Sequence, residues 1–288
     1  MALDFISFFW FILGFGLILI ATIFVVHGRG FKLKPSPRPN LLHLKIATGQ
    51  ISAGTEIEKM TNFLETLSDL HRHAQGWNVF LLGQPYLILN LIVQKNDLAF
   101  IVSFPPAQKR YLQNKLEQAF PRIRWTETDL SWDDPPAQGA VLTLAQNSSK
   151  TNEDKEALPA PGSLFVVQEL QVIQQSFVDH ERLYLQLLIR PSHHKKGAHL
   201  YQTNFRILTF QTTPERGRDL IGKVERLLER IVFARKIHFK LNFPSMSNSN
   251  SLQENCRDYR FDFKNSFYLT ASELAAVYHF FDSGIKHD

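Results

Sequence analysis

The sequence predicts an α+β protein in which an N-terminal transmembrane helix precedes two small tandem units. Three observations predict this class. Residues Phe5 to Val26, near the start of the chain, form a run without any charge. Behind it, apolar segments typical of strands alternate with segments whose apolar residues recur at helical spacing. The order of these segments is then repeated once along the chain.

Composition favours a packed core and a mildly basic surface. The hydrophobic share of 44% and the aromatic share of 12% are ample for a core. A net charge of +5 suits a protein beside an anionic membrane leaflet, and it permits a nucleic acid without requiring one. Cys256 is the only cysteine, which excludes an intramolecular disulfide and a zinc site built on paired cysteines.

The uncharged run has the length of a membrane-spanning helix. At 1.5 Å per residue it extends about 33 Å, which is close to the thickness of one hydrocarbon core. A cleaved signal peptide would need a basic start and a small-residue cleavage site. Here Asp4 precedes the run and bulky residues close it, so we expect a retained anchor within residues 1–30.

The flanking charges predict the orientation of this anchor. Basic residues follow the run and none precedes it, which places the C-terminal side in the cytoplasm and the N-terminus outside. We therefore expect a single-pass protein of the inner or plasma membrane, with the lipid bilayer as one partner. The basic flank consists of Arg29, Lys32, Lys34 and Arg38. Residues 31–39 form a proline-rich spacer.

The first unit is predicted to span residues 40–130. Its first helix begins at a capping box, in which the side chains of Thr55 and Glu58 each accept the other residue's backbone amide. Two apolar runs joined by a short polar turn predict a hairpin. Strands are expected at 40–48, 86–93, 98–104 and 122–127, and helices at 55–71 and 106–120. This order, strand, helix, two strands, helix, strand, is the ferredoxin-like motif.

The second unit, residues 139–266, repeats this order. Thr213 is expected to cap its long helix, with Pro214 at the first helical position. A polar segment at 147–162 is predicted to be a mobile loop. Residues 164–178 suit either a strand or a short helix. Strands are expected at 140–146, 182–190, 204–210 and 236–243. The repeat leaves open whether the two ferredoxin-like units share one sheet.

Residues 267–288 are predicted to contain a strand end, a helix and a tail. Thr270 and Glu273 have the spacing of a second capping box at the start of this helix.

The sequence contains no established catalytic motif. No G-x-x-x-x-G-K-[ST] loop is present to hold nucleotide phosphates, and neither H-E-x-x-H nor G-x-S-x-G occurs. Cys256 has no companion histidine in a credible local frame. We expect no catalytic, cofactor-binding or metal-binding residues, and no cofactor.

Two basic groups are candidates for contact with a partner or a nucleic acid. The first is a predicted hairpin tip that could touch phosphates, although a solvated loop explains it as well. The second lies on the outer face of the long helix, where acidic neighbours dilute the charge and an ordinary polar face is the alternative. The candidates are His193, His194, Lys195, Lys196, Arg218, Arg226 and Arg230.

Two stretches carry a resemblance to a known family. Residues 86–129, with the segment "KLEQAFPRIRW", and residues 267–280, "FYLTASELAAVYHF", resemble the membrane-proximal region of bacterial type IV secretion and conjugation coupling ATPases. In that family a nucleotide-binding domain follows such a region. This sequence departs from the family pattern at Phe281, where the family usually has proline. The resemblance implies an α+β region that serves an ATPase, here without the ATPase domain, so no ATPase residue is carried over.

These observations predict a non-enzymatic membrane scaffold of a type IV secretion or conjugation-like system. Its cytosolic part would contact a separate ATPase, other secretion-system subunits or a substrate. The alternative is a membrane-anchored protein that binds nucleic acid, DNA included. The sequence does not indicate an oligomeric state.

Overall fold

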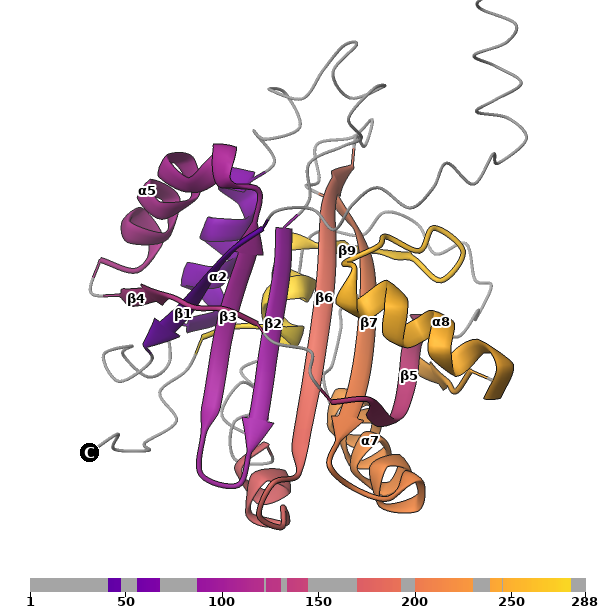
Figure 1. Ribbon diagram of the computed structural model, residues 1–288. Helices are drawn as coiled ribbons and strands as arrows, with labels where there is room; N and C mark the ends of the chain where they lie inside the picture. Colours follow the sequence, from indigo (N-terminus) through magenta and orange to yellow (C-terminus); the bar gives the residue numbers. More distant parts are fainter. Residues whose placement is uncertain are drawn as a thin grey trace, which may run out of the picture. The chain divides into compact units, whose positions relative to one another are not determined.

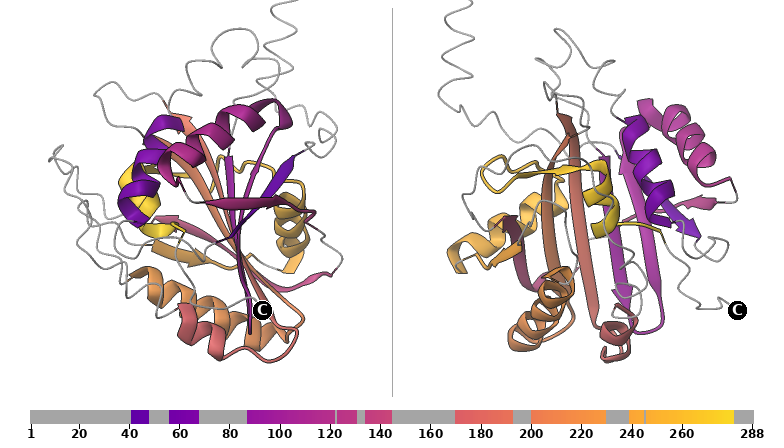
Figure 2. Two further views of the ribbon diagram at one scale, coloured as in Figure 1. Left: turned by 90° about the vertical axis from the view of Figure 1, so that its left-hand side faces the viewer. Right: turned by 180° about the vertical axis from the view of Figure 1, so that it is seen from behind.

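The computed structural model describes residues 41–47, 56–67, 87–121, 123–130, 134–144, 170–192, 200–229, 239–244 and 246–280. These residues all belong to one compact unit, which extends from Asn40 to Asp288 (Figures 1 and 2).

A single nine-stranded antiparallel sheet organises this unit. Its order is β4-β1-β3-β2-β6-β7-β5-β8, and β9 also pairs with β7. The two halves have the same internal order, because β4-β1-β3-β2 matches β8-β5-β7-β6 when each is read from its own edge. The strands are β1 (Leu42–Ala47), β2 (Leu87–Gln94), β3 (Leu98–Phe104), β4 (Arg124–Glu127), β5 (Pro136–Leu144), β6 (Arg182–Ser192), β7 (Leu200–Phe210), β8 (Phe239–Asn242) and β9 (Phe267–Thr270).

Pairing of β2 with β6 joins the two halves at the centre of the sheet. It runs from Leu87 opposite Ile189 to Gln94 opposite Arg182. Both strands are apolar along most of their length, which is typical of strands covered on both faces. Leu89 and Leu187 point into the main core, whereas Ile88 and Leu188 pack on the opposite face.

Helices cover both faces of the sheet (Figure 2). The main core lies between one face and helices α2, α5, α7 and α9, together with a helical segment at 170–175. On the other face, Leu252 and Cys256 of α8 pack against Tyr184, Leu208 and Phe210. The bounds are α2 (Glu56–Leu67), a 3-10 turn (Pro106–Gln108), α5 (Lys109–Ala119), α7 (Pro214–Glu229), α8 (Met246–Arg257) and α9 (Ala271–Val277).

Two predicted helix starts are confirmed. The Thr213 hydroxyl accepts the backbone amide of Arg216 at 3.2 Å, and α7 begins at Pro214. At α9, Thr270 accepts the amide of Glu273 at 3.2 Å, and the Glu273 carboxylate accepts the amide of Thr270 at 2.8 Å. Such a reciprocal cap satisfies two amides that the helix cannot satisfy itself. The predicted cap at Thr55 lies outside the described residues.

The segment from β9 to Phe280 is an integral part of the unit. Strand β9 pairs with β7 of the second half, while α9 packs on α2 of the first half. The buried Phe280 ring makes edge contacts with Phe100 and Phe120 at centroid distances of 5.6 and 5.2 Å. The Tyr278 hydroxyl donates to the carbonyl of Asn90 at 3.0 Å. These contacts tie the two halves together.

The connection from β4 to β5 crosses the sheet, because β4 is one edge and β5 lies beside the other edge (Figure 1). At its start the amide of Thr128 donates to the carbonyl of His43 at 3.0 Å. Near its end Asp134 binds Arg182 and accepts the Gln211 amide at 3.0 Å. The described ends of this connection are therefore held at the two opposite halves of the sheet.

The predicted architecture of a membrane helix followed by two tandem ferredoxin-like units is wrong. The structure is instead a single α+β unit built on one nine-stranded antiparallel sheet. The physical reason is that β2 and β6 are not edges: their backbones pair with each other, and β9 with its helix bridges both halves. Pairing of strands this far apart in sequence leaves no local signal in the chain.

The predicted single-pass membrane protein with a cytoplasmic C-terminal part is wrong for the residues that the structure describes. Among them, no helix has the length and the apolar character needed to cross a bilayer. The predicted span at Phe5 to Val26 and its flank of Arg29, Lys32, Lys34 and Arg38 lie outside these residues.

Replacing Phe280 by alanine tests the contribution of the C-terminal segment. Because the ring is buried against two other rings, we expect Phe280→Ala to lower the free energy of unfolding by about 3–5 kcal/mol, measured by urea denaturation. Phe243→Ala is the control, since the Phe243 side chain is 37% exposed, and its change should stay below about 1 kcal/mol. Equal effects of the two variants would contradict the integral role of Phe280.

Candidate functional site

A polar hollow of about 440 Å³ lies at one end of the sheet. It forms where the β2–β3 turn, the entry to β6 and the exit from β7 meet. This volume falls within the range of small-molecule sites, but such sites are mostly apolar. The lining residues are Gln94, Lys95, Asn96, Asp97, Asp179, His180, Glu181, Arg182 and Gln211.

Two turns at this hollow hold residues in the left-handed backbone region. His180 has φ 78° and Gln211 has φ 55°. This conformation costs non-glycine residues roughly 1–3 kcal/mol and persists where surrounding contacts fix it. Here those contacts include the bond from the Glu181 amide to the carbonyl of Val178 at 3.2 Å and the bond from Gln211 to Asp134.

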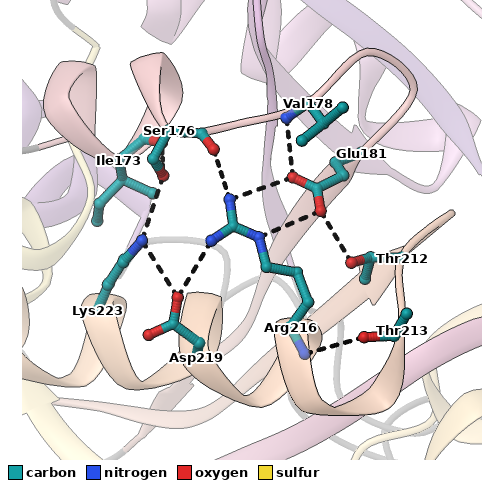
Figure 3. A network of polar contacts seen from close by, with 9 residues as sticks. All are labelled: Ile173, Ser176, Val178, Glu181, Thr212, Thr213, Arg216, Asp219 and Lys223. Atoms are coloured by element: carbon teal, nitrogen blue, oxygen red, sulfur yellow. Dashed lines mark hydrogen bonds and ion pairs between the residues drawn. The ribbon is translucent and has the colours of Figure 1, made fainter.

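Glu181 is the centre of a polar network beside the hollow (Figure 3). Its carboxylate accepts the backbone amide of Val178 at 2.9 Å and the Thr212 hydroxyl at 2.9 Å. The Arg216 Nε donates to the same carboxylate at 3.2 Å. The Glu181 side chain is only 7% exposed and that of Arg216 is 30% exposed, so the carboxylate is the shielded partner of this ion pair.

The network continues along α7 and joins that helix to the segment before β6. Arg216 also binds Asp219 at 3.2 Å and donates to the carbonyl of Ser176 at 2.5 Å. Lys223 binds Asp219 at 3.2 Å and reaches the Ser176 hydroxyl at 3.4 Å. Together these contacts fix the turn of residues 176–181 against the first turns of α7 (Figure 3).

Hydrogen bonding keeps Glu181 ionised. Burial acts to raise the pKa of Glu181, but the Val178 amide, Arg216 and Thr212 together lower it below its ordinary value. A carboxylate that is held in this way by several donors is a structural anion and a poor general base.

The other charges around the hollow also form ion pairs. Lys95 binds Asp179 at 2.8 Å, and Lys45 binds Asp97 at 3.4 Å. Arg182 binds Asp134. The bond from Lys95 lowers the pKa of Asp179. The described residues contain no group of three or more histidine, cysteine, aspartate or glutamate side chains that could hold a metal ion.

A second polar chain runs through the sheet on the face that carries α8. His43 Nδ1 lies 2.7 Å from the Ser103 hydroxyl, which also accepts the side-chain amide of Asn90 at 3.0 Å. The Tyr184 hydroxyl donates to Asn90 Oδ1 at 2.7 Å. Burial lowers the pKa of His43, against an opposing effect of Asp129. Although His43 and Ser103 have the spacing of a base and a nucleophile, Ser103 is fully buried and has no route to a substrate.

The structure places the predicted contact residues as follows. Arg218 and Arg226 lie exposed on α7, and the Arg218 guanidinium is 5.4 Å from the centre of the Phe243 ring. His193, His194, Lys195, Lys196 and Arg230 lie outside the described residues. Sequence reasoning missed the Glu181 network, because its residues come from separate parts of the chain, the segment before β6 and the start of α7. The polar run Asp179-His180-Glu181-Arg182 directly before a strand was the available signal.

No protein-family model and no curated protein matches the sequence. Among solved structures, a chitooligosaccharide oxidase is 13% identical, with a TM-score of 0.36 over 78% of this chain and 53% of the oxidase. The chain thus spans about half the length of that protein. A protein of unknown function from Galdieria sulphuraria is 12% identical, with a TM-score of 0.20 over 71% of this chain and 98% of its own.

A heme-binding protein from Thermus thermophilus is 15% identical, with a TM-score of 0.20 over 74% of this chain and 94% of its own. All three TM-scores are below 0.5, so these similarities decide neither the fold family nor an activity. They also give no link to the conjugation coupling proteins that the two sequence stretches resemble.

Neutralising Glu181 tests the structural role of the network. Glu181→Gln keeps the shape but loses the charge, so we expect a loss of about 1–3 kcal/mol of unfolding free energy at pH 7. Since the pKa of Glu181 is lowered in the folded state, its contribution is complete above the unfolded pKa and disappears as the pH falls through the folded pKa. The difference between wild type and variant in urea should therefore vanish in acid.

Asp179→Asn is the matched control. It removes an ion pair with Lys95 in which the Asp179 side chain is 71% exposed, so its effect on the urea midpoint should be much smaller. A Glu181→Gln difference that persists unchanged in acid would contradict the assignment.

Proposed function

We propose that the unit is a non-enzymatic docking module that binds a Walker-type ATPase of a type IV secretion or conjugation-like system. The ATPase as a partner rests on the two sequence stretches at residues 86–129 and 267–280. The docking role rests on the structural contacts that the buried, potentially reactive side chains make among the described residues.

The observation that supports the proposal is that the buried reactive groups hold the fold together. Burial raises the pKa of the Cys256 thiol to about 11, so the reactive thiolate is suppressed at neutral pH. The fully buried Arg206 donates to the carbonyl of Asn255, in the last turn of α8, at 2.9 Å and to that of Arg260, in the turn after the helix. Arg206 therefore fixes the last turn of α8 and the turn after it to strand β7.

The exposed face around α7 provides a surface of suitable chemistry for docking. Arg218 and Arg226 are exposed on the helix, and the partly exposed Phe243 ring lies under the Arg218 guanidinium. Arginine and aromatic residues are enriched at the centres of protein interfaces. We call Arg218, Arg226 and Phe243 the α7 surface; it fits an acidic patch on the ATPase.

Reversing two charges tests this proposal. The double variant Arg218→Glu, Arg226→Glu should weaken binding to a purified coupling-type ATPase by about tenfold or more, since like charges then face each other. Isothermal titration calorimetry with the wild-type chain gives the reference affinity, and the effect should shrink as salt is added.

Arg110→Glu, at an exposed position on α5, is the control and should leave the affinity within about threefold of wild type, as expected for a charge outside the interface. Absence of any binding by the wild-type chain, or ATP hydrolysis by the purified chain alone, would refute the docking role.

A further inference from the structure

A row of three side chains crosses the sheet on the face that carries α8, away from the α7 surface residues and the hollow. Arg190 of β6 pairs with Gln202 of β7, and Gln202 pairs with Tyr268 of β9. Residues directly opposite one another in antiparallel strands point to the same face. Arg190, Gln202 and Tyr268 therefore lie side by side, and the Tyr268 side chain is 46% exposed.

Two further rings extend this row above the sheet. The Arg190 guanidinium lies 4.9 Å from the ring centres of both Phe261 and Phe263. The two rings contact each other at a tilt of 63° and a centroid distance of 5.2 Å. Phe261 packs on the cluster of Ile88, Leu188 and Tyr259, whereas Phe263 is 64% exposed. Phe263 therefore presents apolar ring surface that a ligand can bury.

The turn that carries these rings lies between α8 and β9 (Figure 1), and hydrogen bonds fix it to the sheet. The buried Asn204 binds the backbone of Asp262 twice, at 2.7 Å through its amide group and at 2.6 Å through its carbonyl oxygen. The Asp262 carboxylate accepts the amide of Lys264 at 3.0 Å, and Gln202 donates to the Ser266 hydroxyl at 2.8 Å. The rings are therefore preorganised, which reduces the entropy lost on binding.

The charge around the rings is positive. Arg190 and residues 257–268 together contain four basic side chains and two acidic ones. Asp258 is paired with Arg257 and Arg260. The Asp262 carboxylate accepts hydrogen bonds within its own turn, from the backbone amide of Lys264 and the side-chain amide of Asn265. The basic groups are Arg190, Arg257, Arg260 and Lys264, and the acidic groups are Asp258 and Asp262.

From this arrangement we infer that the surface formed by Arg190, Phe261, Phe263, Lys264 and Tyr268 binds a single-stranded nucleic acid. Exposed rings on a sheet are platforms on which unpaired bases stack, and adjacent cations bind the phosphates that link those bases. An acidic peptide could use the cations, but it has no flat bases to stack on the exposed Phe263 and Tyr268 rings. A duplex would hide its bases from the rings. This inference does not depend on the α7 surface, because none of its residues belongs to Arg218, Arg226 or Phe243.

Fluorescence anisotropy with a labelled oligothymidylate of about 15 nucleotides tests this surface on the full chain. We expect binding at about 50 mM salt that weakens as salt is added. Phe263→Ala and Tyr268→Ala should each weaken binding by about fivefold or more. Fivefold is about the smallest change in affinity expected when one base loses its stacking partner. Lys264→Gln should weaken binding at low salt and flatten the salt dependence, because one phosphate contact is lost.

Phe243→Ala is the matched control, since Phe243 is also a partly exposed ring beneath an arginine but belongs to the α7 surface. It should bind the oligonucleotide like wild type. Urea midpoints of the Phe263 and Tyr268 variants close to wild type would establish that they are folded.

Three results would overturn the inference. These are no binding at low salt, wild-type affinity in both ring variants, or equal affinity for a duplex of the same sequence. If polyglutamate displaces the oligonucleotide and the two ring variants bind the oligonucleotide like wild type, the surface would be assigned to an acidic protein instead.

Discussion

The pairing of β2 with β6 is the interaction on which the rest of the structure depends. It converts two similar sets of four strands into one sheet, and it places both strands in the interior of that sheet. Both faces of these interior strands are buried, because a second layer covers each face of the sheet. The helices of the main core provide one layer, while α8 and the turn after it provide the other. The hollow, the α7 surface and the surface around Arg190 all lie on elements that this pairing holds in place.

The same constraint explains why polar side chains occur inside the sheet. Asn90, Ser103, Tyr184 and Gln186 are buried on the α8 face, where they satisfy one another or backbone groups. Arg206 and Asn204 extend this set, because they bind the end of α8 and the turn that follows it. Buried polar groups are tolerated only when they are hydrogen-bonded, so they fix the covering segment in one position. In the main core, the buried bonds from the Tyr278 hydroxyl to the carbonyl of Asn90 and from the Tyr201 hydroxyl to the carbonyl of Leu64 have the same effect.

Much of the local structure follows from the sequence. Thr213 with Pro214 and Thr270 with Glu273 identified two helix starts, and the polar turn at residues 95–97 identified a hairpin, because these signals act within a few residues. Strand partners could not be predicted, since periodicity gives the face of a residue but not its neighbour. The continuous apolar character of β2 and β6 was a usable signal for interior strands. The Glu181 network and the Arg190 row escaped prediction because each unites residues from separate elements.

The crossing connection between β4 and β5 has a consequence for synthesis of the chain. All strands of the first half precede this connection in the chain. Strand β6, which pairs with the free edge of β2, is synthesised only after it. About 100 residues separate the ends of β2 and β6, which at roughly 5–20 residues per second corresponds to about 5–20 s on the ribosome. During that interval an apolar strand edge stays without its partner, which is the situation that invites aggregation. The nascent chain therefore passes through a vulnerable period, and holding chaperones would act during it.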